Sequence, residues 1–215
     1  MPVAVQFAPV TNCSERSVAI SNLVSLTTPR AGSRVANTVD QIHVWNGSNW
    51  NIYYNQSGVG FVKSDAADKA VPTSDVVNAG DGVFFRRANY NTTTDITTAG
   101  GIYEGESVSY TLTRNSFTVL SYPWPCAFEI AKFATIMTNP RAGTRVANTV
   151  DQVHIWNGSN WTIYYNQSNV GFVRSDADDK TVPTSDTIAP GDWVFFRRAN
   201  YNANAVVTFT KPEGI

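Results

Sequence analysis

The sequence predicts an all-β protein of two tandem, homologous units, each a β-sandwich or barrel-like domain with room for one short helix. Three observations predict this fold class. A long segment occurs twice in the chain, and within it apolar and polar residues alternate with a period of two. Turn-forming residues separate these short alternating segments at close spacing, which is typical of sandwiches and barrels.

The repeat relates residues 29–91 to residues 140–202 without a gap, at an offset of 111 residues. Of the 63 aligned positions, 50 are identical. Solenoid repeats have periods of roughly 20–50 residues. Each copy is therefore a domain-sized unit, and the chain presents two similar surfaces.

The segments ahead of the two copies also correspond. Residues 4–13 and 116–126 each end in a cysteine and are the expected first strands of their units. We therefore expect a first domain at residues 1–114 and a second at residues 115–215.

A hairpin pattern lies at the centre of each copy. In the first, residues 42–45 and 50–54 are rich in β-branched and aromatic residues and flank the turn Asn46-Gly47-Ser48-Asn49. Asn-Gly readily adopts the positive φ values that a tight turn requires. The equivalent hairpin is centred on Asn157-Gly158.

Other segments have the same period of two and are also predicted strands: residues 59–63, 83–87, 107–113 and 117–120. One segment has a helical period instead, because Ile130, Phe133, Ala134 and Met137 follow the i, i+3, i+4, i+7 pattern. A helix is therefore expected there, and residues 18–24 show a weaker form of the pattern.

Charge and composition exclude some functions. The 16 basic and 17 acidic residues give a net charge of −1, which argues against a nucleic-acid partner. No run of 18 apolar residues occurs, so no membrane span is expected. Cys13 and Cys126 form one disulfide or remain thiols, and their number alone does not decide between these alternatives.

Three motifs of the repeat resemble those of a known group of proteins. They are Asp-Gln-Ile-His-Val-Trp-Asn-Gly at 40–47, Trp-x-x-Tyr-Tyr at 50–54 and Gly-Asp-x-Val-Phe-Phe-Arg-Arg at 80–87. The pattern resembles an uncharacterised family of secreted, β-rich repeat proteins of Verrucomicrobia and related bacteria, over about 60 residues of each unit. The resemblance implies an extracellular or cell-surface setting and supplies no catalytic residue. The first residues do not resemble a signal peptide, so none is expected in this chain.

No residue set in the sequence specifies a chemistry. A Gly-x-Ser-x-Gly nucleophile motif is absent, and each unit has a single histidine, His43 or His154. The loop carboxylates, such as Asp65 and Asp68, do not have the spacing of a calcium loop. We therefore expect no enzyme activity, no metal and no cofactor.

Aromatic residues around the hairpin turns are the candidate ligand-binding or interface residues. Flat rings can cover the C–H faces of sugars, and neighbouring amides can bond their hydroxyls. The alternative is that the rings pack in the core or across strands. The candidates are Trp45, Trp50, Tyr53, Trp156, Trp161, Tyr164 and Trp193, the last of which replaces Gly82 of the first copy.

Both ends of the chain alternate like strands and are candidate assembly elements. Val3, Val5 and Phe7 alternate at one end, and Val207 and Phe209 at the other. A terminal strand can extend a neighbour's sheet, and a head-to-tail contact of this kind gives filaments. We therefore expect an extracellular or cell-surface structural protein that self-assembles into a filament or layer. The alternative is a non-catalytic carbohydrate-binding or adhesion module.

Overall fold

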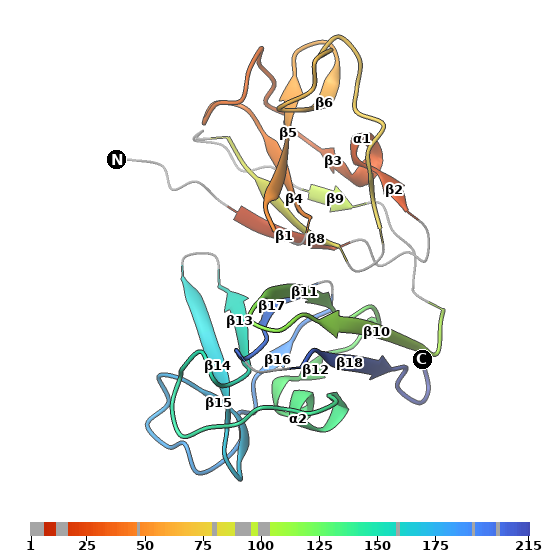
Figure 1. Ribbon diagram of the computed structural model, residues 1–215. Coiled ribbons are helices and arrows are strands. Elements are labelled where there is room, and N and C mark those ends of the chain that lie inside the picture. Colours follow the sequence, from red (N-terminus) through yellow and green to blue (C-terminus); the bar gives the residue numbers. More distant parts are fainter. Residues whose placement is uncertain are drawn as a thin grey trace. The chain divides into compact units, whose positions relative to one another are not determined.

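The computed structural model describes residues 7–11, 17–46, 48–78, 81–88, 96–98, 104–157, 160–190, 192–200 and 203–215, with only the backbone described for 7–11 and 96–98. The chain divides into two compact units, Met1–Tyr103 and Glu104–Ile215. Strands are the predominant regular structure in the described part of each unit (Figure 1).

The first unit is built around one five-stranded antiparallel sheet, in the order β1-β8-β4-β5-β6. Two smaller pairings accompany it, β2 with β7 and β3 with β9. Its elements are β1 (Phe7–Thr11), β2 (Val18–Ala19), α1 (Ile20–Leu23), β3 (Val24–Leu26), β4 (Gln41–Trp45), β5 (Trp50–Gln56), β6 (Gly60–Lys63), β7 (Val76–Val77), β8 (Gly82–Arg86) and β9 (Ile96–Thr98).

The second unit has a five-stranded sheet of the corresponding order, β11-β17-β13-β14-β15. Its smaller pairings are β12 with β16 and β10 with β18. Its elements are β10 (Ser107–Leu112), β11 (Phe117–Ser121), β12 (Phe128–Glu129), the 3₁₀ turn η1 (Ile130–Lys132), α2 (Phe133–Ile136), β13 (Gln152–Trp156), β14 (Trp161–Gln167), β15 (Gly171–Arg174), β16 (Thr187–Ile188), β17 (Trp193–Arg197) and β18 (Ala205–Thr210).

The all-β prediction is confirmed. The helix expected around residues 130–137 is only a 3₁₀ turn followed by one α-helical turn, and the chain is extended again at Met137. Ile130 and Phe133 point into the core, which accounts for the helical spacing of the apolar residues. Within the described residues, no helix has the length and apolar character needed to cross a membrane.

The sequence repeat is also a repeat of strand pairing. Leu26 of β3 lies opposite Ile96 of β9 in the first unit. Met137 lies opposite Val207 of β18 at the same 111-residue offset. The correspondence between the units therefore extends to short pairings that lie outside both the main sheet and the repeated segment.

The boundary between the units lies earlier than predicted. Residues 104–114 were assigned to the first domain, but they belong to the second compact unit. The reason is that β10 pairs antiparallel with β18 along its whole length, from Ser107 opposite Thr210 to Leu112 opposite Ala205. Alternation predicted this strand but carried no information about its partner.

The main core of the first unit lies between two layers. The five-stranded sheet forms one layer, and α1 with the short strands forms the other. Burial of each large apolar side chain contributes up to about 1.5–3 kcal/mol. The core residues are Ile20, Leu23, Val24, Ile42, Val44, Tyr53, Phe61, Val77, Val83 and Phe85.

A loop of residues 29–40 covers one end of the other face of this sheet. Asp40 is wholly buried and accepts hydrogen bonds from the backbone N–H of Arg30 (2.8 Å) and of Ala88 (2.8 Å). It also forms an ion pair with Arg87 (2.7 Å), so its buried charge is compensated. The second unit repeats the arrangement with Asp151, Arg141, Ala199 and Arg198.

The loop approaches the sheet closely enough to require glycine. A Cβ at Gly32 would lie 2.6 Å from Cγ1 of Val39. Val39 packs with Tyr54 and Val62 in a small core beneath the loop. The loop therefore covers this end of the sheet face. Trp45 lies at the other end of the face, outside this small core.

Candidate functional site

The two predicted hairpins are present, and an asparagine side chain closes each turn. Oδ1 of Asn46 accepts hydrogen bonds from the backbone N–H of Ser48 (3.0 Å) and of Asn49 (2.8 Å). This closure puts Trp45 opposite Trp50 at the ends of β4 and β5. In the second unit Asn157 bonds Asn160 in the same way, and Trp156 lies opposite Trp161.

Strand alternation separates the hairpin residues between the two faces of the sheet. Ile42 and Val44 of β4 lie in the main core, so His43 and Trp45 lie on the opposite face. The same alternation applies to β11, β13, β14 and β17. We call the rings that it gathers on this face of the second unit the outer aromatic cluster: Phe117, His154, Trp156, Trp161, Trp193 and Phe195.

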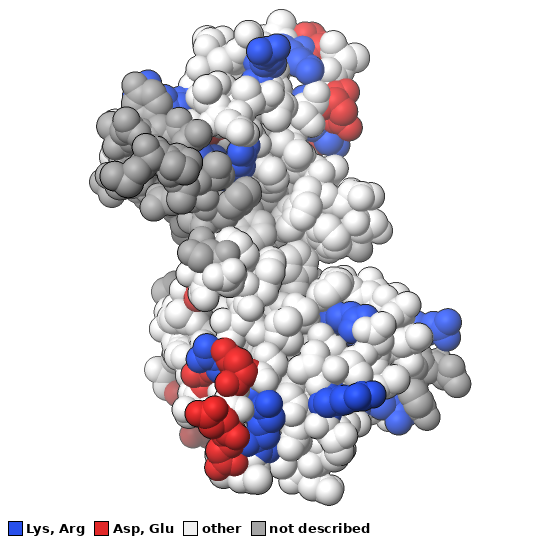
Figure 2. All heavy atoms as spheres, turned by 90° about the vertical axis from the view of Figure 1, so that its left-hand side faces the viewer, with Lys and Arg blue, Asp and Glu red and all other residues white. Residues whose placement is uncertain are grey.

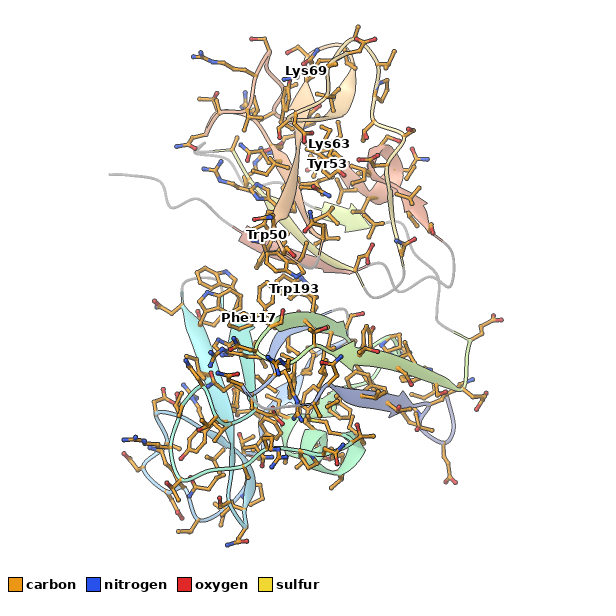
Figure 3. All side chains as sticks on the ribbon, viewed as in Figure 1. Trp50, Tyr53, Lys63, Lys69, Phe117 and Trp193 are labelled. Carbon is orange, nitrogen blue, oxygen red and sulfur yellow. The ribbon has the colours of Figure 1, made fainter. Side chains whose placement is uncertain are left out.

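Phe195 joins the rings of the outer aromatic cluster. Its ring centroid lies 5.1 Å from that of Trp193, 5.4 Å from that of Trp161 and 5.8 Å from that of Phe117. Trp161 in turn lies 5.2 Å from Trp156, with the planes inclined at 60°. Figure 3 shows Phe117 and Trp193 beside the sheet of the second unit. The cluster is a continuous apolar surface made from four strands.

Part of this surface faces solvent. Trp161 is 39% exposed and Phe117 is 38% exposed, whereas Trp193 is only 4% exposed. Among the described residues, these two are the only aromatic members of the exposed large apolar side chains. Trp161 and Phe117 therefore supply the accessible rings of the cluster, whereas Trp193 is covered.

The first unit has a smaller version of the same surface. Trp50 lies 5.1 Å from Trp45 and 5.3 Å from Phe84, and His43 lies beside it at 6.4 Å. Gly82 occupies the position of Trp193, so this unit lacks that ring. The duplication therefore supplies two related surfaces, and among the described side chains the second has more rings.

Two predicted members of the aromatic site do not belong to it. Tyr53 and Tyr164 lie on the core face and are buried. Their hydroxyls donate hydrogen bonds to Asp75 and Asp186, each at 2.7 Å. Burial raises the pKa of both phenols, and the carboxylates raise it further. Their inclusion in a ligand-binding platform was wrong, because an odd spacing from Trp50 or Trp161 places them on the other face.

The C-terminal segment is not a free assembly strand. Val207 and Phe209 are buried inside their own unit, and β18 pairs with β10. Phe7 lies in β1, which pairs with β8 of its own unit. The prediction that Val207 and Phe209 are available to a neighbour was therefore wrong. Val3 and Val5 lie outside the described residues.

Both histidines are held as neutral rings. Nε2 of His43 lies 2.9 Å from Oε1 of Gln41, whose Nε2 donates to the carbonyl of Ala36. The histidine therefore donates the hydrogen bond, and His154 repeats this arrangement with Gln152. Burial is the main cause that lowers the pKa of each ring to about 4, and the charge of the nearby arginine, Arg86 or Arg197, contributes to the same shift.

Neither the cysteines nor the possible metal-binding side chains form a binding site in the described part of the chain. Cys126 forms no disulfide with any described residue, and its sulfur lies 3.6 Å from the hydroxyl of Tyr122. Cys13 lies outside the described residues, so the disulfide stays a prediction. Among the side chains that the structure describes, no group of three or more His, Cys, Asp and Glu is arranged to hold a metal ion.

A charged side chain borders the outer aromatic cluster. The guanidinium of Arg197 lies 5.8 Å from the ring centroid of Phe117, which is a cation–π distance. On the face drawn in Figure 2, charged side chains form small groups with wide uncharged areas between them. The rings of the cluster carry no formal charge themselves, so they suit a neutral partner better than a highly charged one.

Phe117, His154 and Phe195 were missed as members of the aromatic site. Their signal was present, since each alternates with core residues in a predicted strand. What was lacking was the pairing of β11 and β13 with β17, which brings segments about 40 and 80 residues apart into one sheet.

Comparison of the chain with protein-family models, with curated proteins and with solved structures finds no match.

Proposed function

We propose that this protein is a non-catalytic binding module that holds a neutral polysaccharide on the outer aromatic cluster, in an extracellular or cell-surface setting. The observation that carries the proposal is the exposure of Trp161 and Phe117 on one face of one sheet, joined through Phe195. A large apolar patch on the surface of a protein usually marks a binding site.

The chemistry of the cluster suits sugar rings. The C–H faces of a pyranose pack against aromatic faces, and the hydroxyls need polar partners beside the rings. Asn160 is exposed at the hairpin turn next to Trp161, and Arg197 lies beside Phe117. The rings are carried by strands and pack against one another at tilted or edge-to-face angles, so little conformational entropy is lost when a ligand binds.

Retention on insoluble polysaccharides tests the proposal. The parent chain is incubated with cellulose, chitin, xylan and β-1,3-glucan, and the bound fraction is measured after sedimentation. We expect retention on at least one of them, and loss of most of it in the double variant Trp161→Ala, Phe117→Ala. The matched control is Val182→Ala, which removes an exposed apolar side chain outside the cluster.

Two results would contradict the proposal. One is no retention of the parent chain on any of these polysaccharides or on a broad glycan array. The other is full retention by the double variant, with a circular dichroism spectrum that matches the parent. The corresponding variant Trp50→Ala measures the contribution of the smaller cluster in the first unit.

The same surface supports a second candidate function, self-assembly into an extracellular structural layer or filament. The observation in its favour is that the duplication displays related aromatic surfaces twice on one chain, and an apolar patch also fits a second copy. Sedimentation velocity over a range of concentrations tests it. Assembly through this surface should be lost in the Trp161→Ala, Phe117→Ala variant and kept in Val182→Ala.

A further inference from the structure

A strand that closes the second unit has no counterpart in the described part of the first. In the second unit, Val207 of β18 lies between two neighbours, Tyr110 of β10 on one edge and Met137 on the other. In the first unit, β9 takes the place of β18, because Ile96 lies opposite Leu26 as Val207 lies opposite Met137. Among the described residues, β3 is the only strand that pairs with β9.

The core beside this edge is less well covered in the first unit. Leu26 and Val18 are half-buried there. Met137 and Phe128, at the corresponding positions of the second unit, are only 7% and 8% exposed. The second unit is thus closed where the first is partly open.

The second unit also shows which side chains an added strand needs at this edge. The side chain of Leu112 is wholly buried, and the ring of Tyr110 lies 6.0 Å from that of Phe209. The Tyr110 hydroxyl donates to the carbonyl of Ser121 (3.0 Å). Ser109, on the opposite face of β10, is exposed. A closing strand therefore needs apolar or aromatic residues at alternate positions and small polar residues between them.

We propose that the edge of β9 is an acceptor for an extended segment of a partner polypeptide, which adds antiparallel with the alternation of Val108, Tyr110 and Leu112. Such strand addition satisfies the backbone N–H and C=O groups of the edge, and the alternate side chains give specificity. A second copy of this chain is a poor donor, because its own β10 already pairs with β18. Within the part of the chain that the structure describes, each copy thus holds two edges of this type and one strand that fits them.

A peptide with the sequence of residues 105–114 is the probe. It is labelled with a fluorophore and titrated with the full chain, and amide hydrogen exchange is followed by NMR. We expect saturable binding of one peptide per chain, with at least tenfold slower exchange at residues 96–98. The matched control peptide carries Tyr110→Asp and Leu112→Asp, and it should not bind.

Three outcomes would overturn the proposal. The first is the absence of saturable binding, or equal binding by the control peptide. The second is new protection at residues 205–210 instead of 96–98, because the peptide would then replace β10 on β18. The third is a concentration-dependent dimer that the peptide dissociates, because the occupant would then be a second copy.

A second measurement does not depend on peptide affinity. Residues 1–6 are replaced by a further copy of residues 107–116, so that a β10 sequence runs directly into Phe7 as β10 runs into Phe117. The control is the same chain with aspartate at the two inserted positions that copy Tyr110 and Leu112. Compared with this control, we expect slower amide exchange at residues 96–98 and a higher unfolding temperature. Identical behaviour of the two chains would show that the β9 edge accepts no strand.

Discussion

Replacing Asp151 by alanine tests whether a buried ion pair holds the loop of residues 140–151 to the sheet. The side chains of Asp151 and Arg198 are wholly buried, and the carboxylate also accepts from the N–H groups of Ala199 (2.9 Å) and Arg141 (2.7 Å). Alanine would leave the guanidinium without its counter-ion, which costs about 3–5 kcal/mol. Each backbone N–H that loses its acceptor adds about 1–3 kcal/mol where water cannot reach it. We therefore expect the free energy of unfolding to fall by at least about 3 kcal/mol. This is a large part of the roughly 5–15 kcal/mol by which a domain is stable.

Urea unfolding followed by tryptophan fluorescence and circular dichroism measures this loss, with a separate transition fitted for each unit where the two resolve. The matched control is Asp178→Ala, which removes an exposed carboxylate at a position where the first unit has Ala67. A second variant, Asp151→Ala with Arg198→Met, should recover part of the loss because no unpaired charge remains. A loss below about 1 kcal/mol in Asp151→Ala would refute the reasoning.

Three further predictions concern stability. Gly143→Ala places a Cβ 2.5 Å from Cγ1 of Val150, so we expect a loss of about 1–3 kcal/mol in urea unfolding. Leu112→Ala removes a wholly buried side chain from β10 and should cost about 2–5 kcal/mol by the same assay. The pKa values of His43 and His154 are lowered from 6.5 to about 4, so their neutral form is favoured by folding. Their contribution to stability is complete above pH 6.5 and is lost as the pH falls toward 4. The double variant to glutamine should flatten the stability curve over that window, by about 1–2 kcal/mol per ring after allowance for solvent screening.

Much of the local structure follows from the sequence. The hairpins follow from alternation around Asn-Gly, and the turn is stable because the Asn46 side chain bonds two backbone N–H groups. The 50 identities between the copies predicted related units, and the two main sheets have the corresponding strand order. The face on which Tyr53 lies could also have been predicted, because strand parity places it opposite to Trp50.

What the sequence determined by itself was therefore the fold class, the duplication and the local strands, because these depend on residues that are close together in the chain. The tertiary structure alone decided which strand pairs with which. Alternation marks β10 and β18 as strands, but only their pairing shows that Val207 is core and that the boundary precedes residue 107. The outer aromatic cluster likewise depends on long-range pairing, because Phe117, Trp161 and Phe195 meet only when β11, β14 and β17 join one sheet. Backbone hydrogen bonds are the same for every strand, so the choice of partner comes from packing over the whole unit.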